Sequence, residues 1–151
     1  MYKSILVAYD GSTAAAKAFH SALELAERLG AALGVVSVAQ LPEPPTMGET
    51  SAILDAANSH YEKDFRKLRA DAKSRGLELQ THILAGHPAD QIIHRAAETG
   101  ADLIVMGHRG GSRMKEWLLG SISKRVLSYA PCSVLIVRIG VERSTKRGSS
   151  C

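Results

Sequence analysis

The sequence predicts an α/β fold: one domain built on an open sheet of five parallel strands in the order 3-2-1-4-5, with helices on both faces. Short apolar runs of strand length alternate with longer segments whose apolar residues recur at helical spacing, which is the pattern of successive βαβ units. The runs at residues 4–10 and 102–107 are almost continuously apolar, as strands covered on both faces are. Right-handed crossovers then favour a Rossmann-like sheet with the first and fourth strands at its centre.

Each predicted element has its own boundary signals. Turn-forming residues precede the first helix, a proline stands in the first turn of the third, and a glycine or proline lies just beyond each helix. The segment QLPEPPTMGET, residues 40–50, holds three of the five prolines and is predicted to form a loop. The strands are predicted at residues 4–10, 33–39, 77–86, 102–107 and 132–139, and the helices at about 13–29, 51–75, 88–99 and 121–129.

Length and composition narrow the class of protein. A chain of 151 residues, 45% of them hydrophobic and 23% charged, has the size and balance of a folded domain with a substantial core. Its apolar runs fall well short of the ~20 residues that a membrane-spanning helix needs. The first ten residues are too short an apolar stretch for the core of a signal peptide. A cytoplasmic protein that does not enter a membrane is therefore expected.

The domain is expected to span residues 1–140 and to be followed by a basic polar tail at 141–151. The tail has more Lys and Arg than Glu, but it lacks interleaved aromatic residues and any motif that reads a nucleic-acid groove. We therefore predict a disordered tail and no nucleic-acid binding. His82, His87 and His94 have no Cys or carboxylate at metal-ligand spacing, so no metal site built from protein side chains is expected.

The segment MGHRGGSRMKEWLLGS, residues 106–121, concentrates glycines directly after the fourth predicted strand. Glycines allow backbone N–H groups to converge on an anion, and the helix that begins near Ser121 adds free N–H groups and a partial positive charge. The Ser121 and Ser123 hydroxyls add donors, and His108 and Arg109 can add charge. The segment follows strand four, so it meets Asp10 at the point where connections leave the two central strands in opposite directions.

Two well-known phosphate motifs are absent from the sequence. It contains no G-x-x-x-x-G-K-[ST], and no G-x-G-x-x-G follows the first strand. Without the lysine and the magnesium-binding hydroxyl of the first motif, the chain lacks the machinery for fast phosphoryl transfer of that type. The glycine segment is therefore interpreted as a site that holds a polyphosphate.

The spacing Gly107-x2-Gly110-x9-Gly120-Ser121 resembles the nucleotide-binding pattern of the universal stress protein family, in its ATP-binding branch. The stretches ILVAYDGS, ADLIVMGHRG and LLGSISKRVLSYAPCSVLIVR also resemble that family's signatures, so the likeness covers nearly the whole domain. It implies ATP, ADP or AMP as ligand, with any Mg²⁺ held mainly by the phosphates. It also implies a homodimer joined through residues 132–139, antiparallel across a two-fold axis.

The resemblance assigns roles to individual positions. Asp10 matches the acid that faces the adenosine, and the backbone of Val38 matches the group that meets the adenine edge. Ala8 and Met106 help to line the pocket, although some relatives have proline where Ala8 stands. The ribose and phosphate cradle is matched by Gly107, Gly110, Gly120 and Ser121 and is continued by Ile122 and Ser123. Arg109 falls at a variable position of the family, so its phosphate role is inferred from its charge alone.

Simpler structural interpretations stay open beside these roles. Asp10 can serve as the N-cap or the Asx-turn residue of the first helix, Gly107 as an ordinary strand exit, and Gly120-Ser121 as an ordinary helix start. At the level of function, the first hypothesis is a nucleotide-responsive stress regulator with at most slow ATP hydrolysis. A nucleotide-dependent hydrolase or transferase with Asp10 or His108 as base is the second, and an interaction module with an empty pocket is the third.

Overall fold

The structure is a computed structural model that describes residues 1–108, except 43 and 45, and residues 119–139. Within these ranges the chain forms one parallel sheet with the strand order β3-β2-β1-β4-β5. This confirms the predicted order and places the two most apolar strands at the centre. The strands are β1 (Ser4–Ala8), β2 (Ala32–Ala39), β3 (Leu79–Ala85), β4 (Leu103–His108) and β5 (Ser133–Arg138).

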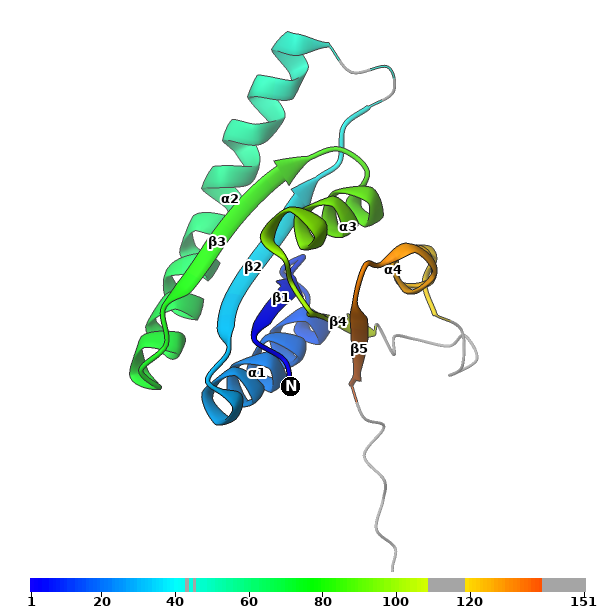
Figure 1. Ribbon diagram of the computed structural model, residues 1–151. Coiled ribbons are helices and arrows are strands. Elements are labelled where there is room, and N and C mark those ends of the chain that lie inside the picture. Colours follow the sequence, from blue (N-terminus) through cyan, green and yellow to red (C-terminus); the bar gives the residue numbers. More distant parts are fainter. Residues whose placement is uncertain (43, 45, 109–118, 140–151) are drawn as a thin grey trace, which may run out of the picture.

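Helices cover both faces of the sheet (Figure 1), as the sequence predicts. They are α1 (Thr13–Leu29), α2 (Met47–Ser74), α3 (Pro88–Thr99) and α4 (Ser121–Tyr129). Side chains alternate between the two faces of a strand, so each central strand contributes to two separate apolar cores. Val7 lies with α1 and α2 in one core, and its neighbour Leu6 lies with α3 and α4 in the other.

The second helix begins earlier than predicted. It starts at Met47, inside the segment 40–50 that the sequence predicted to be a loop, so that prediction is wrong for its last residues. Thr46 is the N-cap: its hydroxyl oxygen accepts a hydrogen bond from the Glu49 amide at 3.3 Å and donates to the Glu49 carboxylate at 2.8 Å. The T-x-x-E capping sequence can begin a helix here because the three prolines of the segment 40–50 all precede Thr46.

Eight of the ten strand ends also differ from the prediction, each by one or two residues. The largest differences are that β1 ends at Ala8 instead of residue 10 and that β3 begins at Leu79 instead of residue 77. None of these differences changes the order or direction of the strands. None of the helices in the described ranges is long and apolar enough to cross a membrane.

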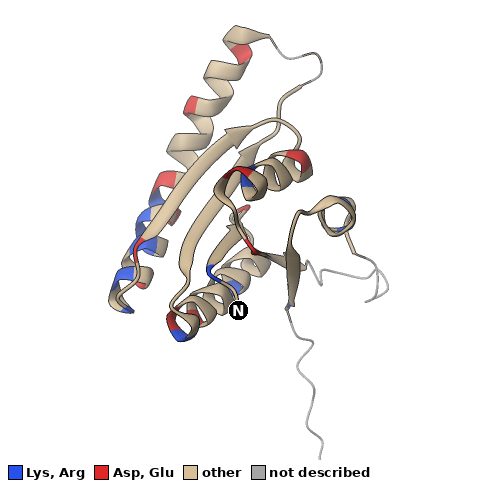
Figure 2. Ribbon diagram, in the orientation of Figure 1, with Lys and Arg blue, Asp and Glu red and all other residues tan. Residues whose placement is uncertain are grey.

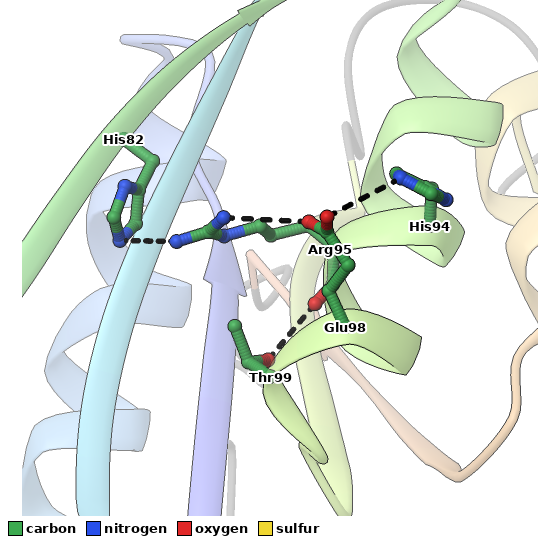
Figure 3. Close-up of polar contacts among 5 residues, drawn as sticks. All are labelled: His82, His94, Arg95, Glu98 and Thr99. Carbon is green, nitrogen blue, oxygen red and sulfur yellow. Dashed lines mark hydrogen bonds and ion pairs between the residues drawn. The ribbon is translucent and has the colours of Figure 1, made fainter.

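Helix α3 is tied to the edge strand β3 by Arg95, whose side chain reaches His82 (Figure 3). The Arg95 Nη2 lies 2.7 Å from the His82 Nε2, and Glu98 meets Arg95 Nη1 at 3.4 Å. Burial, and then the charge of Arg95, lower the pKa of His82, so its ring is neutral at physiological pH. A neutral ring can accept the Arg95 hydrogen bond at Nε2. His82 therefore has a structural role between α3 and the sheet.

Candidate functional site

A cleft of about 890 Å³ opens at the carboxyl ends of the central strands. α1, which follows β1, packs on one face of the sheet, and α4, which follows β4 in the chain order, packs on the other, so the ends of β1 and β4 lie at a switch point of the sheet. The ends of β1, β2 and β4 line the cleft, with α2, α3 and the start of α4 around it. The volume falls in the range of about 300–1,000 Å³ that small-molecule sites occupy.

The cleft brings together most residues that the sequence singled out. Ten of the twelve line it: Ala8, Asp10, Val38, Met106, Gly107, His108, Gly120, Ser121, Ile122 and Ser123. The other two, Arg109 and Gly110, lie outside the described residues. Residues from three separate segments of the chain therefore meet in one cleft, which is the arrangement that the nucleotide hypothesis requires.

The first turn of α4 lines the cleft and carries amides that have no acceptor within the helix. The helical bonds of α4 begin with the Lys124 amide, which donates to the Gly120 carbonyl at 3.0 Å. The amides of residues 121–123 therefore have no acceptor within the helix, and Gly120 provides no side-chain cap. The residues at these amides line the cleft, and two of them are serines with hydroxyl donors. This donor set suits an anion, because the helix dipole adds to the hydrogen bonds.

The two cleft glycines of the described chain differ in their surroundings. A Cβ placed on Gly107 would collide with the backbone carbonyl group of Ala14, in the first turn of α1. Glycine at this position is therefore required for α1 to pack against β4, whatever the cleft binds. At Gly120, no atom of the described residues lies within 4 Å of the position of a Cβ. Its φ of −62° and ψ of 161° are open to any residue.

Asp10 makes the Asx turn that the sequence left as one of its alternatives. Its Oδ1 accepts a hydrogen bond from the Ser12 amide at 3.0 Å. Ser12 is itself the N-cap of α1, and its hydroxyl oxygen accepts from the Ala15 amide at 3.1 Å. Asp10 is exposed and lines the cleft, so the turn fixes the position of its carboxylate there.

The sequence did not indicate the wall that α2 contributes. This wall consists of Ala56, Ala57, His60 and Tyr61. The ring of Tyr61 stacks on Phe65 with centroids 5.7 Å apart, and the His60 ring meets it edge-on at 4.9 Å. The i, i+4 spacing of Ala57, Tyr61 and Phe65 was visible in the sequence as an apolar stripe. The stripe continues past the core, and its N-terminal part lines the cleft.

Tyr9 also lines the cleft, on the side of α1 and α2, and the sequence did not indicate it. Its hydroxyl donates to the Asp64 carboxylate at 3.0 Å, and its carbonyl accepts from the Ser37 hydroxyl at 2.6 Å. Burial, followed by the hydrogen bond to Asp64, raises the pKa of Tyr9 to about 12. Burial and the neighbouring carboxylates also raise the pKa of Tyr61. Both phenols therefore stay protonated at neutral pH.

Comparison with known proteins identifies the family. The model of the universal stress protein family matches residues 1–138. The chain belongs to this family. It is similar to the universal stress protein YxiE of Bacillus subtilis strain 168, with 35% identity over 148 residues, covering 91% of this chain and 100% of that protein. The fold is also similar to that of the universal stress protein UspA from Lactobacillus plantarum, with a TM-score of 0.77 and 29% identity over 91% of this chain and 98% of that one.

Two other similar structures of universal stress proteins contain nucleotides. One is a complex with cAMP, with 28% identity and a TM-score of 0.66 over 92% of this chain and 98% of that one. The other is the protein from Archaeoglobus fulgidus in complex with dAMP, with 27% identity and a TM-score of 0.66 over 89% of this chain and 97% of that one. Members of the family with this fold therefore bind adenine nucleotides.

Proposed function

We propose that this universal stress protein binds an adenine nucleotide in the cleft at the ends of β1 and β4. The observation that carries the proposal is the meeting of an apolar pocket with the amides of residues 121–123, which have no acceptor within α4. The apolar part suits a purine and the amides suit phosphate, so a ligand that spans the cleft has both. The nucleotide complexes of related universal stress proteins support the same ligand class.

In this proposal each part of the nucleotide has its own contacts. Ala8 and Met106 line the base pocket, the Val38 backbone meets the adenine edge, and Asp10 faces the adenosine. The phosphates lie against the first turn of α4, at Gly120 and residues 121–123. Gly107, His108, Arg109 and Gly110 complete the cradle, and the last two of these lie outside the described residues.

The phosphate contacts from described residues are mainly neutral donors. Figure 2 shows that the Lys and Arg residues of α2 gather toward its C-terminal end, whereas the α2 residues that line the cleft lie within 56–61. In the described ranges no three His, Cys, Asp or Glu side chains come together as a metal site. We therefore propose that ATP, ADP or AMP is held chiefly by backbone amides and serine hydroxyls, with any Mg²⁺ held mainly by the phosphates.

We further propose that the nucleotide acts as a signal for a stress regulator, with at most slow hydrolysis. A ligand that binds one conformation more tightly shifts the population toward it, and protein partners can read the change. The segment expected to respond includes residues 109–118, which lie outside the described part of the chain. A nucleotide-dependent hydrolase or transferase with Asp10 or His108 as base is the alternative. Steady-state turnover faster than about one per second would favour that enzyme.

A homodimer joined through β5 completes the proposal. β5 is an edge strand of the sheet, and Leu135 within it is 36% exposed. An apolar edge strand offers unpaired backbone groups that a second copy can cover by antiparallel pairing across a two-fold axis. Light scattering at micromolar concentration is expected to give the mass of a dimer. A monomer under these conditions would contradict this part of the proposal.

Calorimetric titration with ATP, ADP, AMP and cAMP tests the ligand class directly. We expect saturable binding of at least one adenine nucleotide, with GTP as the control for base selectivity and inorganic triphosphate as the control for charge alone. If none of the adenine nucleotides gives heat or competes with a fluorescent analogue at millimolar concentration, the proposed function is wrong.

A further inference from the structure

An ion pair joins α3 to α4 beside the proposed phosphate site. The Arg125 Nε donates to the Asp90 Oδ1 at 2.7 Å. Arg125 lies within one turn of the amides of residues 121–123, and Asp90 lies in the first turn of α3. The same first turns contribute Pro88 and residues 120–123 to the cleft lining. The pair, called here the α3–α4 ion pair, therefore connects two helix ends that meet at the cleft.

Further contacts hold both members of the α3–α4 ion pair in place. Asp90 stands in the positive field of the α3 N-terminus, and the His87 Nδ1 lies 3.9 Å from its other oxygen. The Arg125 guanidinium lies over the Tyr129 ring, 5.4 Å from its centroid. The hydrogen bond with Arg125 lowers the pKa of Asp90, and the same bond raises the pKa of Arg125. Both groups are therefore charged throughout the neutral pH range.

The position of α4 depends on few other described contacts. The helix has nine residues, and its buried residues are Ser123 and Val126. Val126 packs in the core shared with Ala89 and Ile92 of α3, while Ile122 is only partly buried against that core. Because this buried face is narrow, contacts at the first turn contribute to the orientation of the short helix. Hydrogen bonds from its first amides weaken steeply when their angle changes.

We propose that the α3–α4 ion pair is a positioning device that aims the first-turn amides of α4 at the phosphate of the bound nucleotide. Neither side chain needs to touch the ligand for this role. The inference rests on the proposed function, because it requires the nucleotide phosphate to bind at the first turn of α4. It assigns a role to two residues outside the predicted site. It predicts that loss of either partner weakens binding of phosphate-bearing ligands and leaves binding of adenosine, which has no phosphate, unchanged.

A purely electrostatic influence predicts a different pattern, which makes the proposal testable. Removing the negative charge of Asp90 near an anion site would strengthen phosphate binding, and removing the positive charge of Arg125 would weaken it. Positioning requires both partners, so both losses weaken binding. The double variant is then no weaker than the single variants, since the interaction is already lost.

The experiment compares Asp90→Asn, Arg125→Gln and the double variant with wild type by calorimetry, using ADP and adenosine. We expect each of the three to bind ADP about two- to fivefold more weakly, the range that an exposed ion pair allows. The matched control is Glu27→Gln with Arg75→Gln. That pair joins α1 to the end of α2 at 3.1 Å, with exposures of 48% and 40% against 50% for both Asp90 and Arg125. It lies where α1 and α2 lead into β2 and β3, at the opposite end of the strands from the cleft, so ADP affinity is expected to be unchanged.

The outcomes separate this inference from the proposed function. If wild-type protein binds neither ADP nor adenosine, the proposed function itself fails. If wild type binds ADP but the Asp90 and Arg125 variants change its affinity in opposite directions, the charges act through space and positioning is wrong. ADP affinities equal to wild type, or equal losses for ADP and adenosine, would also overturn it. Denaturant melts of every variant show whether the fold is intact at the titration temperature.

Discussion

The two glycine positions on either side of the cleft have the same residue for different physical reasons. Gly107, at the end of β4, faces the backbone of Ala14 so closely that a side chain has no space. Gly120, at the start of α4, faces space that no described residue fills. Both positions match the same family pattern in the sequence. The difference shows that the fold requires glycine at one position of this pattern, whereas the described residues leave space for a side chain at the other.

Changing Gly107 to Ala should produce the largest loss of stability. The new Cβ must displace the first turn of α1 from β4, and overpacking of this kind costs up to about 3 kcal/mol. Chemical denaturation should show a lower free energy of unfolding, whether or not nucleotide is present. Gly120→Ala is the matched control and should lower it by no more than about 1 kcal/mol, the cost of a poorer helix N-cap. Equal stability of the two variants would remove the contrast between the glycines.

Changing Gly120 to Val should instead affect binding. The backbone conformation accepts a side chain, but the branched group would stand where the phosphates approach the first amides of α4. We expect nucleotide affinity to fall at least about tenfold, which corresponds to about 1.4 kcal/mol, while the protein remains folded. Gly120→Ser, which keeps a good helix N-cap, is expected to lose less. Calorimetry measures both, and an unchanged affinity of the Val variant would show that α4 does not hold the ligand.

Tyr9→Phe tests another residue of the cleft lining, with a smaller expected effect. Loss of the hydrogen bond to Asp64 should cost about 1 kcal/mol of stability at neutral pH. Above pH 10 the unfolded chain loses the phenolic proton while the folded protein holds it until about pH 12. Folded protein therefore binds more protons in this range, and stability falls as pH rises. Denaturation between pH 9 and 12 should show a less steep fall for Tyr9→Phe. An identical slope would contradict this assignment of the shifted group.

The sheet was predictable because its central strands are nearly continuous apolar runs. The prediction of the start of α2 failed for a local reason. Because of the three prolines, the loop was predicted to continue to Thr50, but the capping pair Thr46 and Glu49 begins the helix earlier. The family resemblance identified ten residues that line the cleft, because the residues of the family motif lie at the ends of strands and helices.

The α2 residues that line the cleft could not be predicted from the sequence in the same way. Ala57 and Tyr61 share one helical stripe with Phe65, and spacing alone cannot show where that stripe leaves the core. Only the path of α2 across the sheet decides it, and the path depends on packing between distant segments. The packing requirement for glycine at position 107 could not be predicted either, because Ala14, which Gly107 faces, lies more than ninety residues earlier in the chain.

The carboxylate of Asp102 has a consequence for biosynthesis. It accepts hydrogen bonds from the amides of Lys3 and Ser4 at 2.8 and 3.0 Å, across 99 and 98 residues of chain. The backbone partner of β1 in β4 is equally distant in sequence. At ~5–20 residues per second, a ribosome needs roughly 5–20 s to synthesise the chain between Lys3 and Asp102. During that interval the side of β1 that pairs with β4 has no partner strand.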